Sequence, residues 1–257
     1  MIWKLSPSGT SFDSYLVGTM HANTHEAFSH ISPILSCIDQ CAAFAAEFPL
    51  DGDTSAGGNL LLPPGTTLRD YIAPRHYTHL QNALLRYLAL DLDAFRQLLP
   101  LVVAQHIDAL LVSGPERNYP PLDLYLWQYA GQRGKALLGI ETQAEQHAIL
   151  ASIPISEQVR SLEHIGRNLR AHRRKLLALA HLYAMGDHDQ LYRAARRSAG
   201  TMRKNLLLDR NAIMADRIAS SARRQPTCFA IGAAHLGGGK GVLRFLKAKK
   251  VKWTKTT

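Results

Sequence analysis

The stretch YLVGTMH (Tyr15–His21) has the pattern of an apolar strand that ends at a glycine, with a histidine three residues later. Near the other end of the chain, FAIGAAH (Phe229–His235) repeats this pattern. A glycine lets the backbone turn sharply where a strand ends. We therefore expect one sheet with strands from both chain ends. Its carboxyl edge, where open α/β sheets bind ligands, should carry both histidines.

The sequence between these two strands is largely helical. Apolar runs bounded by turn residues predict further strands within residues 1–13, 41–48, 135–141 and 251–255. Apolar residues recur at helical spacing through most of the middle of the chain, and Pro100 is expected to begin or kink a helix there. The expected fold class is α/β, with a central mixed sheet built from both chain ends. We expect a single domain over residues 1–257, with a large helical insertion at about 65–225.

Composition and cysteine content exclude several classes of protein. The hydrophobic fraction of 46% is ordinary for a globular chain. No apolar run reaches about 18 residues, so no integral membrane segment is expected. The first residues lack the pattern of a signal peptide, which makes a cytoplasmic location the default, although an exported protein trimmed of its leader would look the same. Cys37, Cys41 and Cys228 are too few for a disulfide framework, and we expect buried thiols rather than redox or metal roles.

The positive charge does not by itself indicate a nucleic-acid partner. The net charge is +10 and the sequence pI is about 9.7. Much of the excess lies in RNLRAHRRK (167–175) and RAARRSAGTMRK (193–204), where apolar residues alternate with the cations. This pattern is typical of the solvated face of a helix. The sequence contains neither a zinc-finger spacing nor an aromatic-basic RNA-binding signature, so we expect no nucleic acid as partner.

A carboxylate completes the set of candidate ligands. Glu47 is the only charged residue in the run CAAFAAEF (41–48), and a charge there is costly unless it is paired or has a chemical role. Two imidazoles that converge beside a carboxylate make a metal site, so His21, His235 and Glu47 form one candidate group. A surface glutamate at the end of a strand remains the alternative. Glu141, in LLGIE, has the same form as Glu47.

The glycine-rich segment GAAHLGGGKGV (232–242) invites comparison with a phosphate-binding loop. It lacks that motif, because Gly241 follows Lys240 where serine or threonine is required. We expect these glycines to let the backbone approach a substrate or a metal instead.

Taken together, these motifs resemble the TraB/PrgY/GumN superfamily, which includes the Tiki metalloproteases. The matching segments occur in the family's order, at residues 15–28, 42–51, 122–146, 183–191, 206–218 and 229–253. Each is short, but together they cover nearly the whole chain. The resemblance implies a metal-dependent hydrolase whose fold is like that of erythromycin esterases and ChaN-like haem-binding proteins.

The resemblance also implies an active site. Its two Gly-x-x-His motifs and its glutamate fall on His21, His235 and Glu47. Arg210 and Asn211 match its Arg-Asn motif, and Glu141 lies in its central block. These last residues are candidates for a supporting role.

The expected function is therefore a metal-dependent hydrolase, most simply a peptidase that acts on a peptide or protein. His21 and His235 would hold a divalent ion (Mn, Co or Zn), with Glu47 as third ligand or as general base. Arg210 would help to stabilise the oxyanion. In a metal-free variant, His21 would itself be the base, oriented by Glu47.

A binding protein is the alternative function. The same histidines could hold haem or iron without turnover, or the same site could sequester a peptide. The sequence gives no indication of the oligomeric state.

Overall fold

The structure is a computed structural model that describes residues 1–51, 60–112 and 119–256. Contacts within the chain group its residues into two compact units. The first, which we call the sheet unit, comprises Met1–Gly52, Gly114–Gln143 and Leu179–Thr257. The second, the helical unit, comprises Asp53–Ser113 and Ala144–Ala178.

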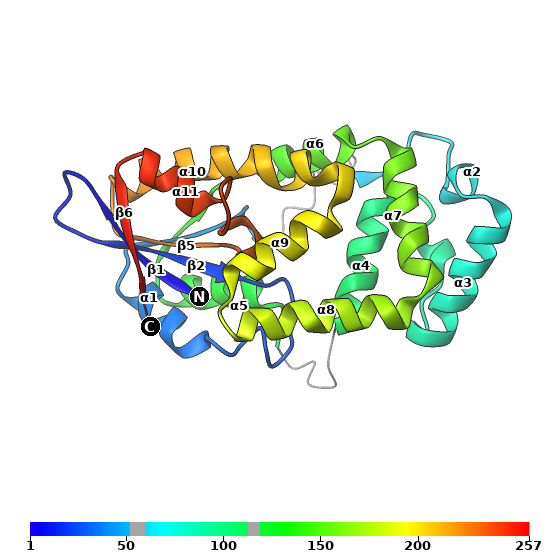
Figure 1. Ribbon diagram of the computed structural model, residues 1–257, viewed down its shortest axis with the longest axis horizontal. Helices are drawn as coiled ribbons and strands as arrows, with labels where there is room; N and C mark the ends of the chain where they lie inside the picture. Colours follow the sequence, from blue (N-terminus) through cyan, green and yellow to red (C-terminus); the bar gives the residue numbers. More distant parts are fainter. Residues whose placement is uncertain (52–59, 113–118, 257) are drawn as a thin grey trace. The chain divides into compact units, whose positions relative to one another are not determined.

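The sheet unit is built on one mixed sheet of six strands. The strands are β1 (Ile2–Pro7), β2 (Ser14–Thr19), β3 (Ala43–Ala46), β4 (Ala136–Gly139), β5 (Thr227–Gly232) and β6 (Val251–Thr256), in the spatial order β4-β3-β5-β2-β1-β6 (Figure 1). β2 pairs with β5 in parallel, with Tyr15 opposite Cys228. This pairing confirms the prediction of one sheet with strands from both ends of the chain.

The direction of the strands brings distant residues to one edge of the sheet. β3 is parallel to both β4 and β5, and β5 is parallel to β2, so the carboxyl ends of all four strands lie at the same edge. β1 is antiparallel to its neighbours β2 and β6. The residues that follow the four parallel strands, His21, Glu47, Glu141 and His235, are therefore delivered to this edge.

Helices cover both faces of the sheet. Those that lie wholly in this unit are α1 (Ile31–Asp39), α5 (Leu122–Gln132), α9 (His188–Ser198), α10 (Asp209–Ala222) and α11 (Val242–Ala248). Figure 1 shows α10 and α11 on one face, and α1 and α5 on the other. Trp3, Phe44 and Phe229 are among the largest fully buried side chains of this core. The three cysteines are buried free thiols, as expected.

Shorter helical segments connect these elements. The sheet unit also contains the 3₁₀ helices η3 (Gly200–Met202) and η5 (Ala233–His235), and a π-helix, η4 (Lys204–Leu208), that leads directly into α10. η5 follows β5 without an intervening loop, so the backbone turns immediately after Gly232. This turn places His235 close to the end of its strand.

The helical unit has a core of its own. It contains α2 (Leu68–Tyr71), α3 (Pro74–Leu88), η2 (Leu92–Phe95), α4 (Pro100–Val112), α7 (Ile155–Arg167), and most of α6 (Gln143–Ser152) and α8 (Leu169–Ala184). Helix α4 begins at Pro100, as the sequence predicts. The buried amide of Gln158 on α7 accepts a hydrogen bond from the Leu101 N–H and donates to the Ile153 carbonyl. The amide thereby ties α7 to the start of α4.

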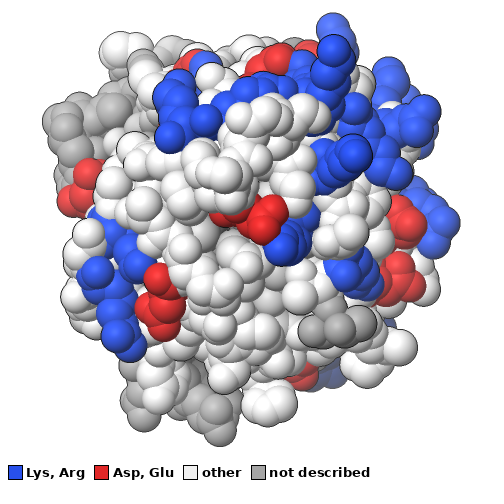
Figure 2. Space-filling view, turned by 90° about the vertical axis from the view of Figure 1, so that its left-hand side faces the viewer, with Lys and Arg blue, Asp and Glu red and all other residues white. Residues whose placement is uncertain are grey.

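Some of the positively charged side chains bind carbonyl groups at the C-terminal ends of helices. Arg223, which follows α10, donates hydrogen bonds to the carbonyls of Ala219 and Lys249, and Lys249 forms an ion pair with Asp216. Cations at a helix C-terminus are favourable because they complement its exposed carbonyls. On the face shown in Figure 2, Lys and Arg side chains lie among acidic and uncharged ones. In the described parts of the chain, no helix combines the length and the apolar character that a membrane span requires.

Candidate active site

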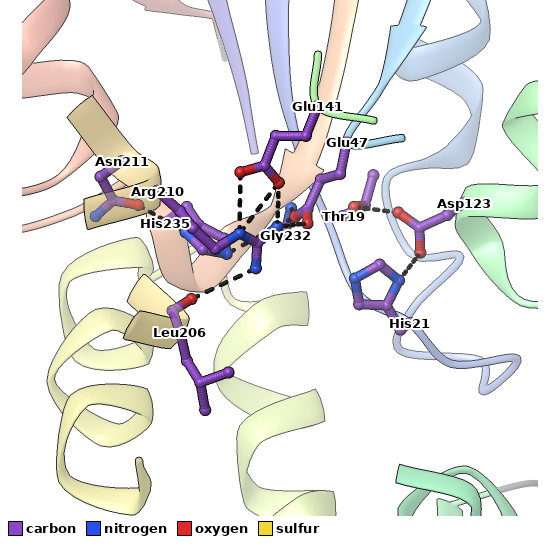
Figure 3. A network of polar contacts seen from close by, with 10 residues as sticks. All are labelled: Thr19, His21, Glu47, Asp123, Glu141, Leu206, Arg210, Asn211, Gly232 and His235. Atoms are coloured by element: carbon purple, nitrogen blue, oxygen red, sulfur yellow. Dashed lines mark hydrogen bonds and ion pairs between the residues drawn. The ribbon is translucent and has the colours of Figure 1, made fainter. Parts of the chain in front are cut away.

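The carboxyl edge of the sheet carries a network of histidines, carboxylates and one arginine (Figure 3). All six residues singled out from the sequence lie in it: His21, Glu47, Glu141, Arg210, Asn211 and His235. Two further residues, Thr19 and Asp123, belong to the same network. Every member belongs to the sheet unit.

His21 is held by a carboxylate from helix α5. Its Nδ1 lies 2.8 Å from Oδ2 of Asp123. The other oxygen of Asp123, Oδ1, accepts a 2.5 Å hydrogen bond from the hydroxyl of Thr19, the last residue of β2. The His21 side chain is 59% exposed, whereas that of Asp123 is 11% exposed. The exposed ring is therefore anchored by a largely buried partner.

His235 is held by a carboxamide from helix α10. The Nδ2 of Asn211 donates to the carbonyl of Lys240 at 2.7 Å, so the Oδ1 of Asn211 faces Nδ1 of His235 at 2.6 Å. A carbonyl oxygen only accepts hydrogen bonds, so Nδ1 must carry the proton. In the neutral ring, Nε2 then bears a free lone pair.

The free edges of the two rings face one place. A carboxylate only accepts, so the contact with Asp123 also assigns the proton of His21 to Nδ1. A Cβ atom added to Gly232 would lie 3.9 Å from Nε2 of His21, 3.5 Å from Cδ2 of His235 and 3.0 Å from Oε1 of Glu47. The free edges of both imidazoles and a carboxylate oxygen therefore border the space left by the missing side chain of Gly232.

Glu47 is a buried carboxylate with two strong donors. Its Oε1 accepts from the Gly232 N–H at 2.6 Å, and its Oε2 accepts from Nη2 of Arg210 at 2.6 Å. Nε2 of His235 lies 3.8 Å from Oε1. The residue is 6% exposed, so it is a partnered interior charge and not a surface glutamate.

Arg210 joins Glu47 to a second buried carboxylate. Its Nε donates to both oxygens of Glu141, at 3.2 and 3.1 Å, and its Nη2 donates to Oε2 at 2.6 Å. Its Nη1 lies 3.4 Å from the carbonyl of Leu206, in the π-helix. The backbone N–H of Glu141 also donates to the carbonyl of Glu47 at 2.6 Å. The guanidinium therefore links the residues that follow strands β3 and β4.

The environment gives the two histidines opposite tendencies to bind a proton. The negative charge of Asp123 raises the pKa of His21 to about 9, although solvent at the exposed ring screens part of this effect. Burial lowers the pKa of His235 to about 4 and outweighs the opposing charge of Glu47. The two imidazoles, although they come from matching motifs, therefore differ in protonation at neutral pH.

The pKa of Glu47 is set by opposing influences. Burial would raise it, but the positive charges of His235 (when that ring is protonated), Arg210 and His21, together with the Gly232 N–H, more than offset this effect. The pKa of Glu47 therefore lies below its usual value, and the carboxylate is ionised at neutral pH.

Two of the three candidate ligands, the imidazoles of His21 and His235, fit a divalent metal. Histidines that bind metals usually have their second nitrogen at a carboxylate or a carbonyl. Here Nδ1 of His235 donates to Asn211, and Nδ1 of His21 lies 2.8 Å from the carboxylate of Asp123. The carboxylate fits less well, because both oxygens of Glu47 already accept hydrogen bonds. Among the described residues, no group of three or more His, Cys, Asp or Glu side chains is arranged to hold a metal ion.

The structure corrects the expected orientation of His21 in the metal-free mechanism. The carboxylate that contacts His21 is Asp123, and Glu47 is engaged by Arg210 and Gly232 instead. The sequence offered one signal for Asp123, an acid inside the apolar segment PPLDLYLW (120–127). That signal is also what an acid in the first turn of an ordinary helix would give.

The glycine-rich loop has a packing role that the sequence did not indicate. A Cβ at Gly238 would lie 2.2 Å from the ring of Tyr192, and one at Gly241 would lie 2.0 Å from the carbonyl of Gly237. Gly238 also has a φ of +75°. These glycines let the loop pack closely against α9 and against itself, and Asn211 binds the loop at the Lys240 carbonyl.

Comparison with known proteins gave one match. The family model described as "TraB/PrgY/gumN family" matches residues 1–255. No curated protein and no solved structure matched the chain.

Proposed function

The chain belongs to the TraB/PrgY/gumN family, and we propose that it is a metal-dependent hydrolase that cleaves amide bonds in a peptide or protein. One observation carries this proposal: the free edges of His21 and His235 border the same space beside Gly232, while their Nδ1 atoms are held by Asp123 and Asn211. A nucleic acid is not expected as substrate.

His21 and His235 are the residues that would hold the ion, a divalent Mn, Co or Zn. When bound, such an ion acidifies water and thereby makes a nucleophile available near neutral pH. The low pKa of His235 keeps its Nε2 lone pair free at neutral pH. The exposure of His21 leaves that side of the site open to solvent and to a substrate.

Glu47 would act as third ligand or as general base. Its carboxylate is ionised, and Oε1 borders the space beside Gly232. A base must lie within reach of the water whose proton it accepts, and Oε1 would be the oxygen that accepts the proton of a water in this space. Its hydrogen bond to the Gly232 N–H fixes the carboxylate against the end of β5.

Arg210 would support Glu47 and favour the charge that develops on the substrate. Its guanidinium keeps Glu47 ionised in a buried position. The same positive charge would stabilise an oxyanion formed nearby. Glu141 holds Arg210 from the other side, and Asn211 holds His235.

A metal-free hydrolase is the second candidate. It is favoured by the hydrogen bonds that already engage Glu47 and by the absence of a three-donor group among the described residues. In this variant, His21 in its neutral form is the base that takes a proton from water, so the rate should rise as the pH approaches its pKa of about 9. Asp123 stabilises the ring that becomes charged.

A peptide-cleavage assay tests the proposal. The purified chain is incubated with a mixed peptide library, with Mn, Co or Zn or with a chelator, and new termini are identified by mass spectrometry. We expect cleavage that requires metal and is lost in His21→Gln and His235→Gln. His25→Gln, four residues after His21, is the control that should keep it.

Other results of this assay would favour one of the alternative functions. Cleavage that persists in chelator but is lost in His21→Gln would support the metal-free variant. No cleavage of any library, together with a Soret band on addition of haem, would overturn the proposal in favour of a haem-binding protein.

A further inference from the structure

The two Gly-x-x-His motifs are alike in sequence but differ in the partner that holds each ring. His235 is 7% exposed and is fixed by its surroundings as well as by the neutral Asn211. His21 is 59% exposed, so the surroundings constrain its ring far less. A specific partner must therefore supply the orientation that packing supplies for His235.

Asp123 has the geometry of such a partner. Its Oδ2 is buried and has no hydrogen-bond partner among the described residues, apart from the ion-pair contact with His21. Its Oδ1 is held by the Thr19 hydroxyl, so the carboxylate cannot rotate away without the loss of a second contact. The neighbouring backbone is also tied in place, because the Leu122 N–H donates to the carbonyl of Ala22, directly after His21.

We infer that Asp123, anchored by Thr19, is the positioning residue of the site: it fixes the His21 ring with the proton on Nδ1 and with Nε2 directed to the space beside Gly232. One oxygen of the buried Asp123 carboxylate is held by Thr19. The other oxygen can therefore orient the exposed imidazole of His21 without contacting the substrate. This role serves the proposed hydrolase in either form, because both use the Nε2 lone pair of His21 in its neutral form.

The test reads the proton position directly, in the metal-free chain. The ¹⁵N chemical shifts of the His21 ring are recorded at about pH 10, where the ring is neutral even beside Asp123. The signal is assigned by its loss in His21→Gln. We expect the Nδ1–H form in the unaltered chain. We expect the Nε2–H form, which an unconstrained imidazole in water favours, in Asp123→Leu.

A second pair of variants keeps the test decisive if Asp123→Leu does not fold. Thr19→Val removes the anchor of Asp123 with little change of volume, and should increase the Nε2–H fraction of His21, whereas Thr19→Ser should restore the Nδ1–H form. Asp108→Asn is the matched control. It alters the carboxylate that lies 2.6 Å from Nε2 of His172 in the helical unit and should leave His21 unchanged.

The inference and the proposed function can fail separately. An Nε2–H form of His21 in the unaltered chain, or an Nδ1–H form that persists in Asp123→Leu or in Thr19→Val, would overturn the role of Asp123 whether or not the chain cleaves peptides. If peptides are cleaved, Asp123→Asn should lower kcat about 10–100-fold with little change in KM. An unchanged kcat would also overturn it.

Discussion

The carboxylate of Glu47 and the guanidinium of Arg210 meet at 2.6 Å, although the two residues are 163 positions apart in the chain. The contact joins the end of β3 to the start of α10, and both side chains are largely buried. Two charges are buried together at little cost only if their hydrogen bonds are satisfied, and here Gly232 and Glu141 supply the remaining partners.

Replacement of Glu47 by glutamine should abolish most hydrolysis and leave the chain folded. The change is nearly isosteric, but an amide neither accepts a proton nor binds a metal well, so we expect a loss of about 10²–10⁴-fold in kcat. The weaker contact with Arg210 should lower the free energy of unfolding by about 1–3 kcal/mol. Peptide cleavage and thermal melting on one preparation give both values.

Glu163→Gln is the control for this experiment, because it alters a carboxylate that is paired with His76 in the helical unit. A folded Glu47→Gln chain that cleaves peptides at the original rate would remove Glu47 from the mechanism. Glu141 would then be the next carboxylate to examine.

Replacement of Arg210 by methionine should destabilise the fold. It leaves the buried carboxylates of Glu47 and Glu141 without their common cation, and loss of one partner of a buried ion pair costs about 3–5 kcal/mol. Removal of one negative charge, in Arg210→Met with Glu141→Gln, should recover part of the loss. Urea denaturation measures both effects, and Arg69→Met, at an exposed pair with Asp93, should have a much smaller one.

The pH dependence of Arg210→Met follows from the same charges. Without the arginine, burial raises the pKa of a carboxyl in the folded chain above its value in the unfolded chain. The folded state then binds a proton more readily, so the loss of stability relative to the unaltered chain should shrink as the pH falls from 7 towards about 5. A difference between the two chains that is independent of pH in this range would show that the carboxylates have found other partners.

His235 should make the unaltered chain sensitive to mild acid. Its pKa is about 4 when folded, against about 6.5 when unfolded, so the unfolded state binds more protons between these values. Stability should therefore fall by up to about 3 kcal/mol as the pH is lowered from about 6.5 to about 4. His21 does not interfere, because its raised pKa affects stability only above about pH 6.5.

Chemical denaturation in the presence of a chelator, at pH values across this range, tests the prediction. His235→Gln should flatten the dependence. An equally steep fall in the variant would assign it to another group.

Gly232→Ala should separate the site from the fold. The φ of Gly232 is −53°, which alanine adopts without strain, so only the added methyl group matters. That group would fill the space shared by His21, His235 and Glu47, with its closest contact 3.0 Å from Oε1 of Glu47. We expect a folded chain, only slightly less stable, that has lost cleavage.

Gly18→Ala in the other Gly-x-x-His motif provides the comparison. A Cβ there would lie 2.6 Å from Cδ1 of Leu236, inside the core, so stability should fall more than in Gly232→Ala. Full cleavage activity in Gly232→Ala would show that the reaction does not use the space beside Gly232.

The strand ends of the site could be predicted from local sequence, but the partners of the histidines could not. Glycine followed by histidine marked the ends of β2 and β5, and an isolated acid in an apolar run marked Glu47 and Glu141. Arg210 and Asn211 were found only through the family resemblance, because an Arg-Asn pair on a helix has no distinctive local pattern.

The role of Asp123 depends on tertiary structure. Asp123 lies 104 positions from Thr19, and its distance from His21 is set by how α5 packs on the sheet. Its local sequence reads as an ordinary helix start. The grouping of the helices also depends on tertiary contacts, which join Asp53–Ser113 with Ala144–Ala178 and leave β4 in the sheet unit.

Anomalous X-ray scattering from crystals of the chain grown with zinc or manganese would show whether His21 and His235 bind one metal ion, because it locates the ion and identifies its ligands. We expect a peak in the space beside Gly232, within about 2.0–2.2 Å of Nε2 of both His21 and His235. A peak elsewhere, or no peak in crystals of a chain that cleaves peptides only with added metal, would contradict it.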